Sequence, residues 1–324
     1  FPAEYAVGVL NHHAGMYPTW VHVEDLRRHG VEFRAPCVNA SAWDTTLERD
    51  APLERGDVPA RADGRDPLGS GRSIPGRPTR AVRIGLGRVA GLAAATGARI
   101  VAAREDGPDG PGRPFRGLAD LGARVRPTLP ELEALILAGA LDFTGRTRPS
   151  LLLEARVAHG VGARGRPAPA AARELVAPDG APLAPEAAPP MELPALPEFT
   201  PAERVRGECR ATGLWFSAHP LEVWVAPTAR RGVTPAAALP GRAGCQAAVV
   251  GLPCAWRRVE TKSGGSMLFL TLADQSGLAE CVLFPDAYRA LATAVRGAIV
   301  RAEGRVDETL DAVTLVVGRA KSLA

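Results

Sequence analysis

The chain reads Met267-Leu268-Phe269-Leu270-Thr271-Leu272-Ala273, then Asp274-Gln275-Ser276-Gly277, in the stretch that decides its C-terminal fold. Leucines occupy every second position, which is the period of a strand with one buried face. The polar group that follows and ends in glycine is typical of a turn. We therefore predict a strand whose leucines point inward, while Met267, Phe269 and Thr271 point outward.

Further strands and one helix are predicted around this segment. The strands are expected at 245–259, 278–284, 298–306 and 312–319, and the helix at 285–295. Gly251 lies inside the first strand, at a position where barrel strands bend. Three strands, a helix and two strands are the element order of the OB-fold, a small barrel that binds single strands and oligosaccharides. We predict such a nucleic-acid-binding domain over residues 243–324.

The outward side of this barrel holds the candidate single-strand site. Trp256 and Phe269 are candidate platforms, because aromatic rings stack on bases of every kind. The candidate phosphate contacts are Arg257, Arg258, Lys262 and Arg305. The alternative is that both aromatic rings complete the core and that the charges only keep the barrel soluble.

Glycines recur between apolar residues in 84–92, ahead of a helix predicted to run through Ile100. A dinucleotide-binding loop would need alternating parallel strands around it, and the sequence predicts none. A helix-hairpin-helix is the better interpretation, because its backbone N–H groups at a helix N-terminus hold a phosphate without reading sequence.

Two frames are open for this hairpin. The turn holds Gly85 and Gly87 in one frame, and Gly91 with Ala93 in the other. We prefer the second frame because the helix downstream is better spaced for it, although Ala93 in place of glycine limits close phosphate approach. The DNA-backbone candidates here are Arg83, Gly85, Gly87, Arg88 and Gly91.

A second hairpin is predicted between a helix at 131–138 and a return helix at 148–157. Gly139 lies in its turn, and Arg146 and Arg148 lie beside it, so all three are DNA-backbone candidates. For both hairpins, a plain helical corner with a C-cap glycine stays open as the alternative.

The remaining segments complete an α+β, multidomain organisation. Residues 1–48 are compact and mostly helical, and 81–159 form the helix-hairpin-helix block. Residues 49–80, rich in Gly, Pro, Arg and Asp, predict a flexible insertion. Residues 160–197, rich in Ala and Pro, predict a linker. A connecting helical segment over 198–242, with Thr200 as a helix N-cap, leads to the barrel.

Composition sets broad limits on function. The 324 residues carry a formal net charge of +4, and Lys262 and Lys321 are the only lysines. Genomic bias is the first explanation for the many arginines, although the guanidinium fork also suits phosphate. The mild basic excess permits a nucleic-acid partner without proving one. The chain has no apolar stretch of about 20 residues and no leader, and it starts at Phe1 inside a helix. We expect a cytoplasmic fragment with no membrane partner.

The sequence shows no catalytic or metal-binding constellation. Its five cysteines have no Cys-x-x-Cys spacing, so buried free thiols are expected. The adjacent His12 and His13 point to different faces of a helix and make a poor metal pair. The isolated acids are expected to be solvated turn residues: Asp106, Asp109, Asp307 and Asp311. We expect no catalytic residue, metal or cofactor within this chain.

Short segments in a fixed order carry a family resemblance. Before residue 80 they are 1–5 with Leu10-Asn11, 15–18, 27–31 and 36–39. After it they are 82–92, 135–142, Gly213-Leu214 with 218–221, and in the barrel 269–272 with Asp274, Gly277 and 282–285. In this order they resemble bacterial DnaE-type (C-family) DNA polymerase III alpha subunits, particularly error-prone members. Segments 49–80 and 160–197 do not match well.

The resemblance implies a DNA-directed DNA polymerase, a nucleotidyltransferase that uses two carboxylate-bound metal ions. In the family, the aspartates that hold these Mg ions lie in a palm domain upstream of Phe1. This chain then grips duplex backbone and single-stranded template during replication or error-prone repair synthesis, and alone it turns nothing over. A sliding clamp and other replication or translesion proteins are further candidate partners.

Three other functions are weighed against this one. A free-standing helix-hairpin-helix and OB-fold DNA-binding protein without catalytic activity is the main alternative. A DNA ligase would need a nucleophilic lysine and zinc cysteines, yet the two lysines lie in the first barrel loop and near the C-terminus. The hairpin block argues against a synthetase anticodon-binding domain.

Overall fold

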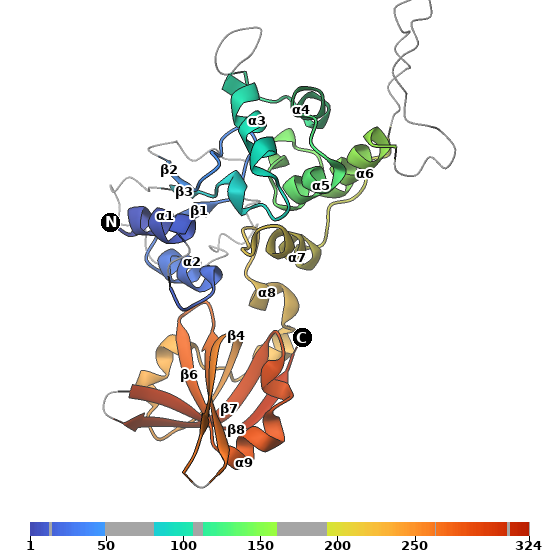
Figure 1. Cartoon of the computed structure of the whole chain (residues 1–324). Helices are drawn as coiled ribbons and strands as arrows, with labels where there is room; N and C mark the ends of the chain where they lie inside the picture. Colours follow the sequence, from blue (N-terminus) through green and yellow to red (C-terminus); the bar gives the residue numbers. More distant parts are fainter. Residues whose placement is uncertain are drawn as a thin grey trace, which may run out of the picture.

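The structure is a computed structural model that describes residues 1–12, 15–48, 81–105, 113–160, 193–262, 264–309 and 312–323. A mostly helical part holds the N-terminus, and a β-barrel lies below it in Figure 1, with α7 (Pro201–Thr212) and α8 (Pro220–Trp224) on the path between them. The predicted insertion 49–80 and most of the predicted linker 160–197 lie outside the described residues. The α+β class is confirmed.

The barrel has the predicted element order. Its elements are β4 (Gln246–Glu260), β5 (Ser266–Ala273), β6 (Leu278–Leu283), α9 (Pro285–Leu291), β7 (Val300–Thr309) and β8 (Ala312–Ser322). The strands close in the order β4-β5-β6-β8-β7, and β7 pairs back to β4. This confirms the OB-fold. The helix is shorter than predicted, because a 3-10 turn, η6 (Ala294–Arg296), replaces its last part.

The alternating leucines fill the barrel, as predicted. The exposed fractions of Leu268, Leu270 and Leu272 are 6%, 1% and 0%. They pack against Val306 and Leu315 from the last two strands. Burying one such side chain stabilises a fold by roughly 1.5–3 kcal/mol, so this stripe accounts for much of the barrel's stability.

Three short strands form a separate sheet in the helical part. They are β1 (Glu32–Arg34), β2 (Thr46–Glu48) and β3 (Ala81–Arg83), in the order β1-β3-β2. Helices α1 (Pro2–His12) and α2 (Thr19–Arg28) share a core with this sheet. Strand β3 therefore belongs in space with the N-terminal segment, although the sequence groups it with the helices that follow.

Four helices build the block between this sheet and the connector. They are α3 (Ala94–Glu105), α4 (Leu118–Val125), α5 (Leu129–Leu137) and α6 (Arg148–Ala158), with 3-10 turns η1 (Leu86–Arg88) and η2 (Asp142–Thr144). Thr128 and Glu131 form a capping box at the start of α5, and Thr147 caps α6. Each cap satisfies N–H groups that the first helical turn leaves without a partner.

The connector begins with the predicted cap. Thr200 and Glu203 form a capping box on α7, which ends at Gly213 with a left-handed φ of 72°. The 3-10 turns η3 (Pro227–Arg230), η4 (Ala236–Ala238) and η5 (Pro240–Arg242) then lead to β4.

One apolar core joins the connector to the barrel. Its connector members include Val205, Trp215 and Leu221, and its barrel members are Val250, Leu252 and Ile299. In addition, Val21 of α2 packs with Cys254 and Ala273 of the barrel. Contacts of this kind place the barrel against the helical part through buried side chains.

A buried polar cluster lies beside this core. Arg27 donates a 2.5 Å hydrogen bond to Glu24 and a 2.6 Å hydrogen bond to the carbonyl of Trp215. The ring of His219 is 3.9 Å from Glu24, and its Nδ1 accepts the N–H of Leu221 at the start of α8. Burial lowers the pKa of His219 to about 3, helped by Arg27 and Arg28, so the ring is neutral at physiological pH.

The thiols largely fit the expectation of inert core groups. Cys254 and Cys281 are buried, and burial raises their pKa to about 11 and about 12. Cys37 and Cys209 are half-buried. Cys245 departs from the prediction because it is exposed, just before β4 begins. In the described ranges, no helix is both long and apolar enough to cross a bilayer.

Candidate nucleic-acid interface

One outward row of side chains crosses the barrel strands. Cross-strand pairing joins its members in the order Arg257, Phe269, Val282, Val316 and Arg305. Paired residues share a face of a sheet, so all five point to the same side. Phe269 is 40% exposed, and the arginines at both ends are exposed. The outward row thus has an exposed guanidinium at each end and the partly exposed Phe269 and Val316 between them, while Val282 is only 6% exposed.

Phe284 adds to this outward face. It follows the fully buried Leu283 at the end of β6, so strand alternation directs it outward, and 52% of it is exposed. Phe284 is not among the binding residues predicted from the sequence. Extending the inward–outward alternation by one position from Leu283 would have found it. Phe269 and Phe284 therefore put two aromatic rings on the outward face.

Trp256 lies on the other face of the β4–β5 ribbon. It pairs with the inward-pointing Leu270, yet it is 71% exposed, so the alternative that it completes the core is wrong. Arg258 shares this face, opposite Leu268, and lies 3.6 Å from Glu260. The two predicted platforms, Trp256 and Phe269, are therefore separated by the thickness of the ribbon.

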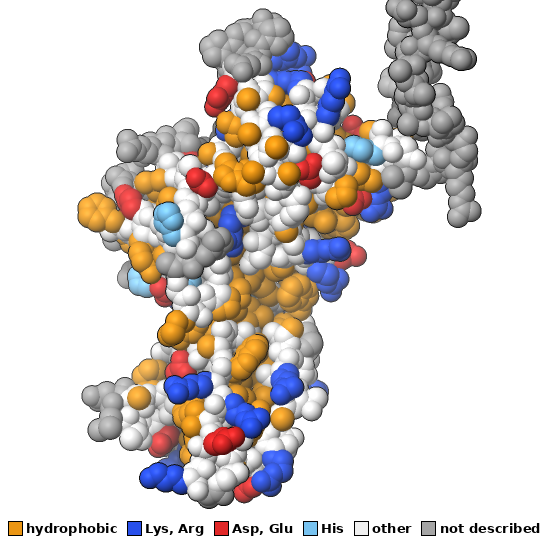
Figure 2. All heavy atoms as spheres, in the orientation of Figure 1, with side chains coloured by type: hydrophobic (Ala, Val, Ile, Leu, Met, Phe, Trp, Pro, Cys, Tyr) orange, Lys and Arg blue, Asp and Glu red, His pale blue; other side chains and the backbone are white. Residues whose placement is uncertain are grey.

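The positive charge of the face is partly offset. Arg257, Lys262 and Arg305 are exposed and have no ion-pair partner within the described part of the chain. Glu280 lies nearby on the outward side, where its carboxylate accepts a hydrogen bond from Thr271, and Asp307 follows Arg305 on β7. On the barrel face visible in Figure 2, basic side chains flank an apolar stretch. Such a surface attracts phosphate, but only mildly.

The first hairpin frame is built for packing. The N–H of Gly85 donates to Thr45 Oγ1, and that of Gly87 donates to the carbonyl of Trp43. A β-carbon at either glycine would collide with residues 43–45. These glycines therefore allow a close approach within the fold, and each N–H that the prediction assigned to a phosphate already has an acceptor in residues 43–45.

The second frame lies at the surface. Gly91 has a left-handed φ of 80°, and a β-carbon there would meet nothing within 4 Å. Residues 93–95, at the start of α3, are exposed. However, the N–H of Ala93 already donates to the carboxylate of Glu131, so it is not available to a phosphate. The amides of Ala94 and Ala95 have no acceptor among the described residues, so they are what this turn presents to a ligand.

The arginines near the hairpins are mostly held inside the fold. Arg148 is 2% exposed and bonds to Asp142, Glu208 and the carbonyl of Leu137. These carboxylates raise its pKa against the effect of burial. Gly139, with φ of 86°, makes room for this guanidinium, because a β-carbon there would lie 2.5 Å from Arg148 Nη2. Arg148 and Gly139 are therefore structural, which corrects the prediction.

Arg83, Arg88 and Arg146 are constrained in other ways. Arg83 lies 2.7 Å from Glu48 and donates to the carbonyl of Ala35, so it stabilises the small sheet. Arg88 is half-buried, and burial lowers its pKa. Arg146 is exposed but paired with Glu154. Of the three, Arg146 is the one whose side chain is exposed.

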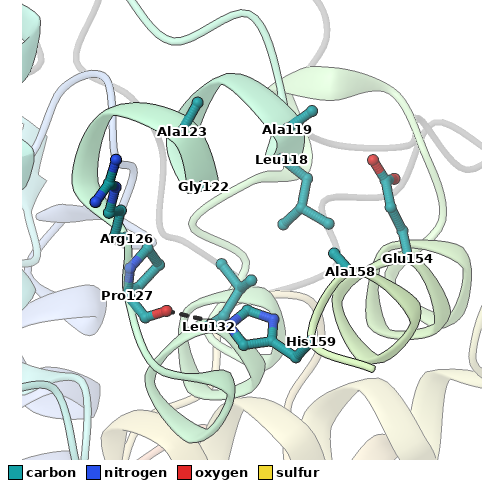
Figure 3. A pocket seen from close by; sticks show the side chains of 10 residues that line it. All are labelled: Leu118, Ala119, Gly122, Ala123, Arg126, Pro127, Leu132, Glu154, Ala158 and His159. Atoms are coloured by element: carbon teal, nitrogen blue, oxygen red, sulfur yellow. Dashed lines mark hydrogen bonds between the residues drawn. The ribbon is translucent and has the colours of Figure 1, made fainter. Parts of the chain in front are cut away.

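A hollow of about 460 Å³ opens between α4 and α6. Figure 3 shows Arg126 and Glu154 at opposite sides of it, with Leu118 and Leu132 between them. His159 on its floor lies 3.2 Å from the carbonyl of Pro127. The hollow is apolar in the middle and holds no cluster of nucleophilic or metal-binding groups.

No group of three or more metal-binding side chains occurs within the residues that the structure describes. His13, Asp106, Asp109 and Asp311 lie outside those residues. Asp307 is exposed near the end of β7, as expected of a solvated residue.

Comparison with known proteins matches both modules. A family model described as a helix-hairpin-helix motif matches residues 30–151, and one described as an OB-fold nucleic acid binding domain matches residues 255–323. The first match starts well before residue 81, in keeping with the sheet that joins β3 to β1.

Curated relatives cover the whole chain. The error-prone DNA polymerase of Anaeromyxobacter dehalogenans (strain 2CP-C) is 32% identical over an alignment of 338 positions, which covers 100% of this chain and 25% of that protein. That of Symbiobacterium thermophilum is 32% identical over 100% of this chain and 30% of its own length. That of Methylococcus capsulatus is 33% identical over 99% and 28%. The chain therefore spans between a quarter and a third of these relatives, and over its whole length it matches the C-terminal part of a DnaE-type DNA polymerase of the error-prone kind.

Proposed function

We propose that this chain is the DNA-holding C-terminal portion of a DNA-directed DNA polymerase that acts in replication or error-prone repair synthesis. The observation that carries the proposal is the outward row, in which two arginines flank Phe269 and two valines on one face of an OB-fold. Arginines at the ends can pair with phosphates while the ring stacks on a base. The barrel then holds the single-stranded template.

The helix-hairpin-helix block has the complementary role. The exposed turn at Gly91 suits a phosphate of the duplex backbone, because the amides of Ala94 and Ala95 have no acceptor among the described residues. In the second hairpin, the exposed Arg146 beside the turn supplies a positive charge. Contacts of this type position DNA without reading its sequence. The carboxylate of Glu131, which accepts the N–H of Ala93, repels phosphate, so this turn holds DNA only weakly.

Bond-making is assigned to the palm domain of the parent protein. There, Mg ions would activate the 3′ hydroxyl and the leaving phosphate. We infer that the 324-residue chain alone has no polymerase turnover and that it works in the cytoplasm. A sliding clamp and translesion proteins are proposed as partners of the complete enzyme.

The test titrates the full chain against a fluorescent oligothymidine at two salt concentrations. We expect weak binding whose logarithm falls with the logarithm of salt, with a slope of roughly −0.7 for each neutralised phosphate. Phe269→Ala should weaken binding by about 1–3 kcal/mol through lost stacking.

The matched control is Phe143→Ala in the helical block, because Phe143 is 41% exposed against 40% for Phe269. It should bind like the parent chain. Binding that ignores salt, or an equal loss in both variants, contradicts the single-strand role.

A further inference from the structure

A basic groove lies on the barrel flank, where the connector meets the last two strands. It encloses about 450 Å³ between residues 228–231 and the facing parts of β7 and β8. Four of its lining residues are basic, namely Arg231, Arg301, Arg319 and Lys321, and one is acidic, Glu303. It lies at the opposite end of the β7–β8 hairpin from the tip between Thr309 and Ala312.

Arg301 and Glu303 shape the groove. Arg301 lies 2.7 Å from Glu303 and donates to the carbonyls of Ala229 and Arg231, so it ties the connector turn to the barrel. This ion pair neutralises the carboxylate. Because Arg301 already makes these charge-assisted hydrogen bonds, it lines the groove and holds its shape, and it is not the group that binds the ligand.

The other three cations are open to solvent. Arg231, Arg319 and Lys321 are exposed, and none has an ion-pair partner within the described ranges. Strand pairing places Lys321 opposite Arg301 and Arg319 opposite Glu303, so both point outward into the groove. Three cations around one hollow, with the neighbouring carboxylate neutralised, form a site for an anion that carries several charges.

The groove also continues the outward row. Arg305 at the end of that row stands on β7, two positions after Glu303 and on the same side of the strand. At roughly 3.3 Å per residue, Arg301 and Arg305 lie about 13 Å apart along the strand. A strand of DNA that leaves Phe269 past Arg305 would follow β7 directly into the groove.

We propose that this groove binds phosphates of the single-stranded DNA that the outward row holds, which extends the binding track around the barrel. The inference rests on the proposed function and adds to it the direction in which the strand leaves. Arg319, Lys321 and Arg231 contact phosphates, and Arg301 holds the connector turn in place.

The experiment compares two lengths of labelled oligothymidine, about 5 and about 15 nucleotides, within the range of roughly 4–16 that OB-folds bind. The variant is Arg319→Gln with Lys321→Gln in the full chain. It should bind the short oligonucleotide as the parent chain does. It should bind the long one about fivefold more weakly, as expected for two exposed ion pairs. Its salt slope on the long one should be shallower by roughly 1.4.

Arg289→Gln is the control, because it removes a cation from the same barrel, on α9 and outside the groove lining. It should leave both affinities unchanged. If the parent chain binds neither oligonucleotide, the proposed single-strand role itself fails. If the parent chain binds both and the double variant matches it on the long one, the groove is not part of the track. Competition by polyglutamate as effective as by DNA would point to an acidic protein instead and would overturn the assignment.

Discussion

The guanidinium of Arg148 packs so closely against Gly139 that no side chain fits at position 139: a β-carbon there would lie 2.5 Å from Arg148 Nη2. The glycine also has a left-handed φ of 86°. The guanidinium in turn joins the α5–α6 turn to α7 through Glu208. This pair fixes the corner of the helical block.

Gly139→Ala should lower the free energy of unfolding by about 2–3 kcal/mol, because backbone strain and a collision with a buried charge add together. Urea unfolding followed by circular dichroism measures this. Gly145→Ala is the control, since Gly145 has a φ of 68° with open space around it. It should lose only about 1 kcal/mol. Equal losses would show that the contact with Arg148 does not matter.

Arg148→Met should cost about 3–5 kcal/mol, because it leaves the 1%-exposed Glu208 without its buried partner. The control Arg146→Met breaks a more exposed pair with Glu154 and should change stability by less than about 1 kcal/mol. Chemical denaturation of both variants decides between the roles. A larger effect on DNA binding than on stability in Arg148→Met would restore Arg148 as a DNA contact.

Trp256→Ala should leave the barrel folded, since the side chain is 71% exposed. Its effect on a short oligonucleotide should be smaller than that of Phe269→Ala, because the indole lies on the reverse face of the ribbon. Thermal unfolding and anisotropy titrations together measure both effects. A collapsed barrel would show that Trp256 supports the core after all.

Glu131 should make the fold sensitive to strong acid. Its pKa is lowered to about 2 against the effect of burial, by hydrogen bonds from Thr128, Thr96 and Ala93. A depressed carboxylate pKa stabilises the fold above the unfolded value near 4.5, and this contribution, roughly 3 kcal/mol, is lost as pH falls toward 2. Glu131→Gln should flatten the stability curve in that window. Glu203→Gln, in the exposed capping box of α7, should flatten it far less.

His219 should make the stability depend on pH in a second, less acidic pH range. Its pKa falls to about 3 in the folded state from 6.5. The unfolded chain therefore binds the proton first, and stability declines as pH drops below about 6.5. His219→Asn keeps a side-chain acceptor for the cap of α8 and removes the titration. Its unfolding free energy should stay level between pH 6.5 and 5, and a slope equal to that of the parent chain would contradict the assignment.

The barrel was predictable because its signal is local. Alternation at Leu268, Leu270 and Leu272 reports one buried face, and turns at glycine separate the strands. The small sheet was not predictable in the same way, because three-residue strands carry almost no periodicity and β3 pairs with β1 across a long interval of sequence.

The site was predictable in part for the same reason. Arg257, Phe269 and Arg305 lie on one row because strand register follows from alternation. Arg148 was placed at the DNA backbone because its burial depends on two carboxylates, and only Asp142 is near it in sequence, whereas Glu208 is 60 positions away. Arg319 and Lys321 form a groove only together with Ala229 and Arg231 of the connector, which lie far from them in sequence. Partners of this kind are invisible to any local pattern.

The core that Trp215 and Leu221 share with Val250 has a mechanical consequence. A barrel joined to the helices by a flexible linker alone would take many orientations. A barrel that shares a buried core with the helices keeps one orientation relative to them. On the proposed function, packing sets the angle between a duplex on the hairpins and a template that leaves the barrel. A variant that loosens Trp215 would then change this angle although Trp215 contacts no nucleotide.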